Sequence, residues 1–533
     1  MWDNIGFLDS KRETSELATK QANHQFVKTD VPGRLDRLPW SKWHWLIVCG
    51  LGVTWVLDGL QVTLQGAIGA FLSSKEALGL SEDQIGISAS CYLTGAVIGA
   101  LGFGYATDRF GRKKLFYITL IVYLSAVLLT ACAWNWYSYC AFLAMAGAGI
   151  GGEYAAINSA IDELIPARLR GTVDLIINST YWLGAVIGSA ATLVFLDPKI
   201  IPAWLGWRMT FAIGGVLGLG VLVIRHWVPE SPRWLMTHGH NEKAEQIVKH
   251  VEDLVREEKG SLPPVTEPPL YLVQRHHTPW DEVFRTFLVT SRTRSILGLV
   301  LMSAQSFFYN AIFFTYGLVL NKFYGVKPDR IGEYIVPFAL GNLLGPILLG
   351  RLFDTVGRKK MIAITYAASG ILLAITAYLF ENGMLTAQTQ SLAWVLICFI
   401  ASSAASSAYL TVSELFPLEI RAMAIALFYA LGTLVGGVAA PAYFGHLIAS
   451  GSRASLATGY FLGAGLMCVG SIFEWIFGVD AEQKSLEQIS PPLVTRTDDD
   501  ESKPDESSMP ESETGPEVSP EISPDVSLDP PLQ

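Results

Sequence analysis

The segment GYATDRFGRKK at residues 104–114 returns 246 positions later as GRLFDTVGRKK at residues 350–360. A second pair of segments supports the same repeat, because ELIP at residues 163–166 matches ELFP at residues 414–417. Two polar motifs that recur with nearly the same offset indicate that the chain contains two copies of one structural unit.

The composition favours a membrane protein. Of the 533 residues, 51% are hydrophobic and 16% are charged, whereas soluble domains have about 25% charged residues. Apolar runs of about 20 residues, the length of a membrane-spanning helix, lie near residues 44–72, 84–106, 115–133, 138–160, 173–195, 207–227, 294–320, 330–352, 361–379, 392–414, 422–450 and 455–478. The sequence therefore predicts an all-α membrane protein with twelve transmembrane helices in two six-helix pseudo-repeats.

The apolar runs divide the chain into five regions. These are an N-terminal segment at 1–43, a first half at 44–227, a linker at 228–293, a second half at 294–478 and a tail at 479–533. Within the linker, the segment from Glu242 to Glu258 places Ile247, Val251 and Leu254 at helical spacing among charged residues. This pattern predicts an amphipathic helix on the cytoplasmic face.

The distribution of basic residues predicts the orientation. Clusters of Lys and Arg follow even-numbered spans at residues 109–114, 168–170 and 351–360, whereas the opposite loops at 133–136 and 381–383 have none. By the positive-inside rule both termini are cytoplasmic, and we expect a multi-pass protein of the plasma membrane.

The net charge of −10 comes from the C-terminal tail. From residue 498 onward there are twelve acidic residues and one basic residue, a net of −11, which leaves +1 for residues 1–497. A tail of this composition cannot bury enough apolar surface to fold. It is either a solvated disordered segment or a regulatory, partner-binding one.

Several functional classes lack support in the sequence. There is no Gly-rich phosphate loop, metal-ligand cluster or nucleophile motif, and the six cysteines show no CxxC spacing. His276 and His277 have no other candidate ligands nearby. We therefore expect neither an enzyme nor an ATP-driven pump, and no cofactor, metal site or nucleic-acid partner.

The repeated motifs resemble the major facilitator superfamily over about residues 44–478. The segments PESPRWL at 229–235 and GWR at 206–208 resemble its sugar-porter branch more narrowly. The resemblance implies the major facilitator fold and a lattice of ion pairs on the cytoplasmic side, which would latch each half. Its members would be Asp108, Arg112, Glu163, Arg170, Glu230 and Arg233 in the first half, and Asp354, Arg358, Glu414 and Arg421 in the second. The alternative is that the basic residues only set the topology.

Four pairs of glycines one helical turn apart fall in spans 2, 5, 8 and 11. They are Gly95/Gly99, Gly184/Gly188, Gly341/Gly345 and Gly432/Gly436. Small residues at this spacing allow helix backbones to approach closely in lipid. We expect the spans that carry these pairs to form the contacts between the two halves, with dimerisation of the whole protein as the competing interpretation.

Two acidic residues lie inside predicted spans, where an ionisable group is costly and marks a functional candidate. Asp58 is in span 1, at the position where proton-coupled sugar porters carry an acid. Glu153 is in span 4 and resembles the acid in the Gly-Gly-Asp-Tyr motif of phosphate:proton symporters. Both are candidates for proton coupling; the alternatives are an acid paired for packing or a contact to a cationic substrate.

The resemblance to sugar porters also implies binding residues, because amide side chains suit hydroxylated substrates. The candidates are Gln61, Asn178, Gln305, Tyr309, Asn310 and Tyr409. Leu143 stands where sugar porters have a span-4 arginine, and Phe308 replaces a glycine of the family. The cavity is therefore expected to differ in shape from a sugar site.

We expect a transporter that moves a sugar, polyol or organic acid by alternating access, with proton symport. Its partners would be a small-molecule substrate, protons and the lipid bilayer, and it would be a monomer. No Lys or Arg lies in the middle of a predicted span, which disfavours an anionic substrate. The alternatives are an uncoupled facilitator and a non-transporting sensor or scaffold with the same fold.

Overall fold

The structure, a computed structural model, describes residues 25–72, 77–195, 200–266, 268–274, 278–313, 316–326 and 332–493. All of them belong to one compact unit that spans residues 1–495. His276, His277 and the acidic segment from residue 494 onward lie outside the described residues.

Six long helices form the first bundle. They are α3 (Lys42–Leu72), α4 (Glu82–Phe110), α5 (Arg112–Ala131), α6 (Trp136–Leu164), α7 (Arg170–Phe195) and α8 (Ala203–Arg225), with the 3-10 turn η1 (Ala167–Leu169) before α7.

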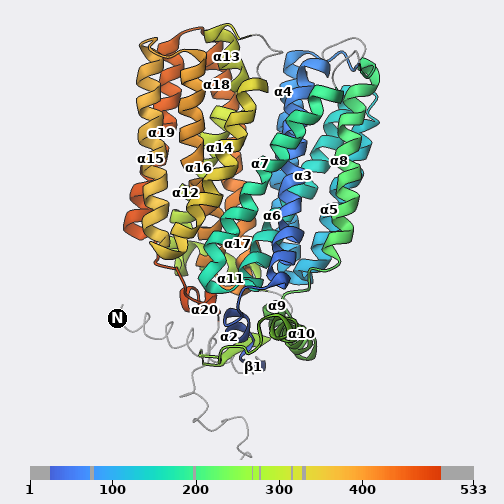
Figure 1. Cartoon of the computed structure of the whole chain (residues 1–533), viewed down its shortest axis with the longest axis vertical. Coiled ribbons are helices and arrows are strands. Elements are labelled where there is room, and N and C mark those ends of the chain that lie inside the picture. Colours follow the sequence, from blue (N-terminus) through green and yellow to red (C-terminus); the bar gives the residue numbers. More distant parts are fainter. Residues whose placement is uncertain are drawn as a thin grey trace, which may run out of the picture. The chain divides into compact units, whose positions relative to one another are not determined.

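The second bundle repeats this order. It contains α12 (Arg292–Phe313), α13 (Tyr316–Tyr324), α14 (Gly332–Thr355), α15 (Arg358–Glu381), α16 (Ala387–Leu415), α17 (Arg421–Gly432), the π-helical turn η5 (Thr433–Val438), α18 (Ala439–Ala449) and α19 (Arg453–Phe477), with the 3-10 turn η4 (Leu418–Ile420) before α17. Figure 1 shows the two bundles beside each other, the first in blue to green and the second in yellow to orange. In the described part of the chain, ten segments are long and apolar enough to cross a membrane. α7 and α12 complete the set of twelve.

The repeated motif forms the same turn in each bundle. Gly111 ends α4 with φ of 97°, and Gly357 follows α14 with φ of 120°. Both values lie in the left-handed region that favours glycine. The chain can therefore reverse within one residue in the first copy and two in the second, and the next helix begins at Arg112 or Arg358.

The glycine pairs pack against helices of their own bundle, although the spans that carry them do join the two halves as predicted. Gly95 and Gly99 on α4 face the backbone of Ala144 and Ala148 on α6. The other pairs likewise lie against α3, α16 and α12 of their own half. The same four spans meet across the halves on their other faces, where α7 packs on α14 and α4 packs on α17. A Cβ on Gly104 would clash with Ala426 of α17, so this motif glycine permits the α4–α17 contact.

Short elements gather at one end of the bundles, which we call the linker end (Figure 1). They are α2 (Val31–Asp36), α9 (Pro232–Thr237), α10 (Asn241–Lys259), α11 (Trp280–Arg285), the π-helical turn η2 (Thr286–Thr290) and α20 (Leu486–Ile489). A two-stranded antiparallel ribbon joins β1 (Gln25–Thr29) to β2 (Leu270–Gln274), with Val27 opposite Leu272. The sequence analysis expected no strand.

The linker helix α10 covers the predicted segment but buries a different face. Ala244, Val248, Val251 and Val255 are buried, whereas Leu254 is 38% exposed. The buried face of α10 is therefore formed by Ala244 and the three valines, and α10 packs against α2, α3 and α9.

The ordered chain also extends past the predicted start of the tail at residue 479. Residues 479–493 include α20 and contact the linker end of the bundles. Glu482 accepts a hydrogen bond from the Arg358 backbone, and the Lys484 carbonyl accepts one from Arg170. These partners come from distant parts of the chain, which is why composition alone placed the segment in the tail.

Candidate functional site

A cavity of about 190 Å³ lies between the two bundles. The first bundle lines it with residues of α3, α4, α6 and α7, and the second with residues of α12, α16, α17 and η5. Five of the residues predicted to bind substrate line this cavity: Asn178, Gln305, Tyr309, Asn310 and Tyr409. The fold thus brings together side chains that are more than 200 positions apart.

Asp58 lies in the wall of the cavity and is 1% exposed. Its carboxylate accepts a hydrogen bond of 2.7 Å from the Tyr92 hydroxyl and another from the Tyr154 hydroxyl. The adjacent Gly59 allows α3 to approach the backbone of Tyr181 on α7, because a Cβ there would clash. This close packing of α3 on α7 fixes the position of Asp58 in the cavity wall.

Aromatic rings surround the carboxylate. Trp55 stacks on Tyr154 with ring centroids 4.5 Å apart, and Tyr429 meets Tyr154 edge-on at 4.6 Å. Tyr409 of the second bundle lies 5.8 Å from Trp55. Rings held in this way offer flat apolar faces and polar hydroxyl edges to a bound molecule.

The opposite wall is polar but uncharged. Asn310 donates to the Ser306 carbonyl at 2.8 Å, so its orientation is fixed by its own helix. The Tyr309 hydroxyl donates to Asn342 at 2.7 Å. No Lys or Arg is among the described residues that line the cavity.

Gln61 and Glu153, both predicted from the sequence, do not line the cavity in this structure. Gln61 is fully buried inside the first bundle, and neither its amide oxygen nor its amide nitrogen has a hydrogen-bond partner among the described residues.

Glu153 forms a buried ion pair with Arg225 at the end of α8. Both side chains are fully buried, and Arg225 also donates to Thr54 and to the Phe116 carbonyl. The sequence analysis missed Arg225, since it ends an apolar run and resembles a membrane-boundary residue. The guanidinium of Arg225 therefore offsets the charge of Glu153 inside the first bundle.

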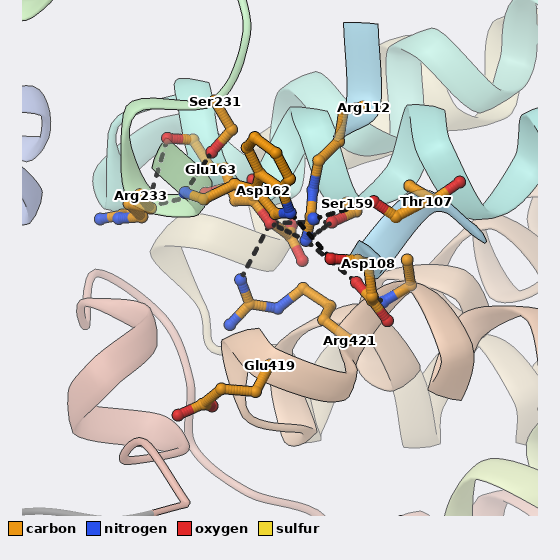
Figure 2. Close-up of polar contacts among 12 residues, drawn as sticks. Thr107, Asp108, Arg112, Ser159, Asp162, Glu163, Ser231, Arg233, Glu419 and Arg421 are labelled. Atoms are coloured by element: carbon orange, nitrogen blue, oxygen red, sulfur yellow. Dashed lines mark hydrogen bonds and ion pairs between the residues drawn. The ribbon is translucent and has the colours of Figure 1, made fainter. Parts of the chain in front are cut away.

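At the linker end, the motif residues of the first bundle form a cluster (Figure 2). Arg112 donates to Glu163 at 2.8 Å and to Asp108 at 3.2 Å. Its backbone N–H donates to Glu230 at 2.9 Å. Burial raises the pKa of Glu230 above its usual value, although hydrogen bonds from the backbone of Ser231, Arg112 and Lys113 partly offset this.

Two ion pairs of this cluster cross between the bundles, where the resemblance implied latches within each half. Arg170 of α7 lies 3.4 Å from Glu414 of α16, and Arg421 of α17 lies 3.7 Å from Glu163 of α6. Figure 2 shows Arg421 reaching toward Glu163 from the other bundle. Glu414 also pairs with Arg358 of its own half.

The motif aspartates also join the bundles. Asp108 accepts hydrogen bonds from the backbone N–H groups of Ala422 and Met423, the latter at 2.9 Å. Asp354 accepts from those of Gly171 and Thr172, at 3.1 and 2.7 Å. In each case a carboxylate meets the positive end of a helix in the opposite half, which is a favourable arrangement.

Arg233 links both terminal segments to the cluster. It pairs with Asp36 of α2 at 3.1 Å and with Glu487 of α20 at 3.2 Å. Asp36 also lies 3.6 Å from Arg170. The sequence analysis missed both acids, because nothing in the local sequence signals a partner some 200 positions away.

The chain is similar in sequence to known transport proteins. Residues 50–492 match the family described as sugar (and other) transporter. The chain is 28% identical over 422 residues to the niacin transporter of Acinetobacter baylyi, which covers 79% of this chain and 90% of that protein. It is 27% identical over 431 residues to the 4-hydroxybenzoate transporter of the same species, and the alignment covers 78% of this chain and 88% of that protein.

Among solved structures, the chain resembles XylE of E. coli, a proton:xylose symporter of the major facilitator superfamily, with a TM-score of 0.70 and 19% identity. The alignment covers 84% of this chain and 98% of XylE. The prediction of a twelve-helix major facilitator fold is therefore confirmed. The matched proteins are transporters rather than enzymes, as the sequence analysis expected.

Proposed function

The chain belongs to the sugar (and other) transporter family and is a multi-pass integral membrane transporter, and we propose that it carries a small polar metabolite through the central cavity together with a proton. The central cavity lies where alternating-access transporters bind substrate, at the interface of two like-built halves. Contacts that join the halves at the linker end are of the kind that must break when the cavity opens there.

Asp58 is the observation that carries the proposal of proton coupling. It is the one acidic residue among the described residues that line the cavity. Its hydrogen-bond partners there are tyrosine hydroxyls and no basic side chain. A carboxylate without a fixed counter-charge can bind a proton and release it, whereas Glu153 has Arg225 as its partner. We therefore assign proton coupling to Asp58 in preference to Glu153.

The lining favours a neutral ring compound with hydroxyl or amide groups. Aromatic faces suit a flat or cyclic molecule, and Asn178, Gln305 and Asn310 can donate and accept hydrogen bonds. No basic side chain of the described lining would offset a fixed negative charge. Niacin, 4-hydroxybenzoate and xylose, for which the relatives are named, are also compact ring compounds, but the first two carry a carboxylate at neutral pH and only xylose is neutral.

We also propose that the protein is a monomer in the plasma membrane. Its linker end would face the cytoplasm. The basic residues 109–114 and 358–360 all lie at this end, as the positive-inside rule requires of a cytoplasmic side. Both terminal segments contact the same end through Asp36 and Glu487. In the state described here, the linker end is closed by the contacts between the bundles.

Reconstitution of the wild type and Asp58→Asn in proteoliposomes tests the proposal. Pools of sugars, polyols, aromatic acids and amines are added outside, while substrate uptake and internal pH are followed. Asp253→Asn, which alters an exposed acid of α10, is the matched control. We expect one pool to drive proton entry in the wild type and in the control. In Asp58→Asn proton entry should be lost, while exchange of labelled for unlabelled substrate persists.

Other outcomes separate the alternatives. Uptake without proton movement in the wild type would overturn coupling and leave a facilitator. Proton entry that persists in Asp58→Asn would overturn the assignment of the carrier. Absence of uptake with every pool would contradict transport and favour a sensor.

A further inference from the structure

Two buried carboxylates adjoin the linker-end cluster and take no part in the side-chain contacts described above. Asp162 on α6 and Asp174 on α7 are both fully buried. Among the described residues, no group forms a hydrogen bond with any oxygen of either carboxylate. An ionised carboxylate buried in this way is costly, so such a group is expected to be neutral or to bind a positive charge.

The charges around Asp174 are mostly of the same sign. Asp162 and Glu414 are its acidic neighbours, and Arg358 and the Asn178 amide are its favourable ones. Two like charges that share one site cannot both ionise at low cost.

The surroundings of Asp162 are mixed. Glu414 acts on it unfavourably, whereas Arg170, Arg421 and the Ser413 hydroxyl act favourably. Glu414 and Arg421 belong to the second bundle, so part of this environment exists only while the linker end is closed.

The nearby arginines have other partners. Arg170 pairs with Glu414, and Arg358 pairs with Glu414 and Asp354. Arg421 donates to two backbone carbonyls at the end of α16. None of these guanidinium groups forms an ion pair with Asp162 or Asp174 in the described residues, so the two acids have no fixed counter-ion.

A further unsatisfied group points to the same place. Asn178 lies one turn after Asp174 on α7 and lines the central cavity. Its amide nitrogen donates to the Asp174 carbonyl at 2.8 Å. Asn178 is only 6% exposed, and its amide oxygen has no hydrogen-bond donor among the described residues. The carboxylate oxygens of Asp162 and Asp174 thus lack donors, even though guanidinium nitrogens of Arg170, Arg358 and Arg421 also lack acceptors. A bound proton would supply a donor at the carboxylates themselves.

We propose that Asp162 and Asp174 form a second protonation site, which binds protons when the linker end closes and releases them when it opens. Closing removes water from both carboxylates and brings Glu414 close to them, so the neutral acids are favoured. Opening separates the bundles and readmits water, so the acids can ionise. This inference concerns the linker end, and it does not require Asp58 to be the proton carrier.

Distance measurements by pulsed electron paramagnetic resonance test the proposal without a substrate. Lys114 and Lys360 are exposed at the first turns of α5 and α15, one on each bundle. Spin labels on Lys114→Cys and Lys360→Cys, with the six native cysteines replaced by serine, report on closure of the full chain in lipid nanodiscs. We expect the ratio of closed to open molecules to fall as the pH rises from 5 to 8, by up to about tenfold per pH unit for each proton released.

Substitutions identify the groups responsible. Asp174→Asn and Asp162→Asn should each make the dependence on pH shallower, and the double variant should remove most of it. Asp174→Glu retains a carboxylate and should keep the dependence, which guards against variants that merely misfold. A wild type that shows no dependence on pH, or a double variant that matches the wild type, would overturn the proposal.

Asp58→Asn separates this site from the proposed proton carrier. If Asp58→Asn alone abolishes the pH dependence of closure, the inference fails while proton coupling by Asp58 stands. The number of protons taken up per substrate in proteoliposomes then distinguishes two sources. Protons that arrive through the cavity would make this number smaller by about one in Asp174→Asn, whereas protons exchanged with the cytoplasm would leave it unchanged.

Discussion

Asp108 and Asp354 cap helices in each other's half of the molecule. Asp108 lies in the last turn of α4 in the first bundle and accepts hydrogen bonds from the first N–H groups of α17 in the second. Asp354 lies in the last turn of α14 in the second bundle and does the same for α7 of the first. Each copy of the repeated motif therefore caps a helix of the opposite half, and the two contacts together close the linker end.

Removing either cap should favour the state that is open at the linker end. Asparagine keeps the size of the side chain in Asp108→Asn or Asp354→Asn but loses the charge that the helix end favours. A partly buried charge at a helix terminus contributes about 1–2 kcal/mol, so the ratio of closed to open molecules should fall about 5- to 30-fold. The spin-label pair at Lys114 and Lys360 measures this ratio. Asp253→Asn is the control, and an equal shift in it would contradict the capping role.

Breaking the Glu153–Arg225 pair should destabilise the first bundle. Arg225→Met leaves Glu153 buried without its partner, at a cost of about 3–5 kcal/mol. The double variant Arg225→Met with Glu153→Gln removes both charges and should recover much of this loss. Thermal unfolding in detergent gives the comparison. Additive losses in the double variant would show that the pair contributes no coupling energy.

Amides that line the cavity should affect substrate affinity, and a buried amide outside it should not. Gln305→Ala or Asn310→Ala removes a donor and an acceptor from the lining, so we expect the substrate concentration for half-maximal uptake to rise about tenfold. Gln61→Leu should leave this concentration unchanged, since Gln61 is enclosed within the first bundle. A strong effect of Gln61→Leu would show that Gln61 reaches the substrate in another state of the cycle.

The N-terminal helix α2 should detach from α10 in acid. Burial alone would raise the pKa of Glu252, but hydrogen bonds and charges of Arg34 and Arg37 outweigh it and hold the pKa below its usual value of 4.5. A lowered pKa in the docked state means that the contribution to docking is fully present above pH 4.5. It is lost as the pH falls through the lowered pKa.

Hydrogen exchange of residues 31–37 measures this docking. Protection should be constant above pH 5, should decrease at lower pH and should be weak at all pH values in Glu252→Gln. Glu257→Gln, which alters another acid of α10, serves as the control. Loss of protection that is independent of Glu252 would assign the acid response to other groups.

Periodicity and repetition in the sequence were enough to predict the membrane fold. Twelve apolar runs and the two copies of the motif at residues 104–114 and 350–360 place the spans and divide them into halves. Asp58 and the amides of α12 could also be identified as candidate site residues. A polar side chain in an apolar span is costly, so it usually has a function. These signals are local, so a single sequence carries them.

The tertiary structure alone decided which groups meet. The sequence names Glu153 but not Arg225, and Arg233 but not Asp36 or Glu487. It identifies the spans that join the halves but not the neighbours that the glycine pairs face. A side chain's partner depends on which face of its helix turns toward which neighbour, and residues far apart in the chain supply that neighbour. Charge type and helical spacing are fixed by the sequence, whereas burial and pairing arise only when the two bundles pack together.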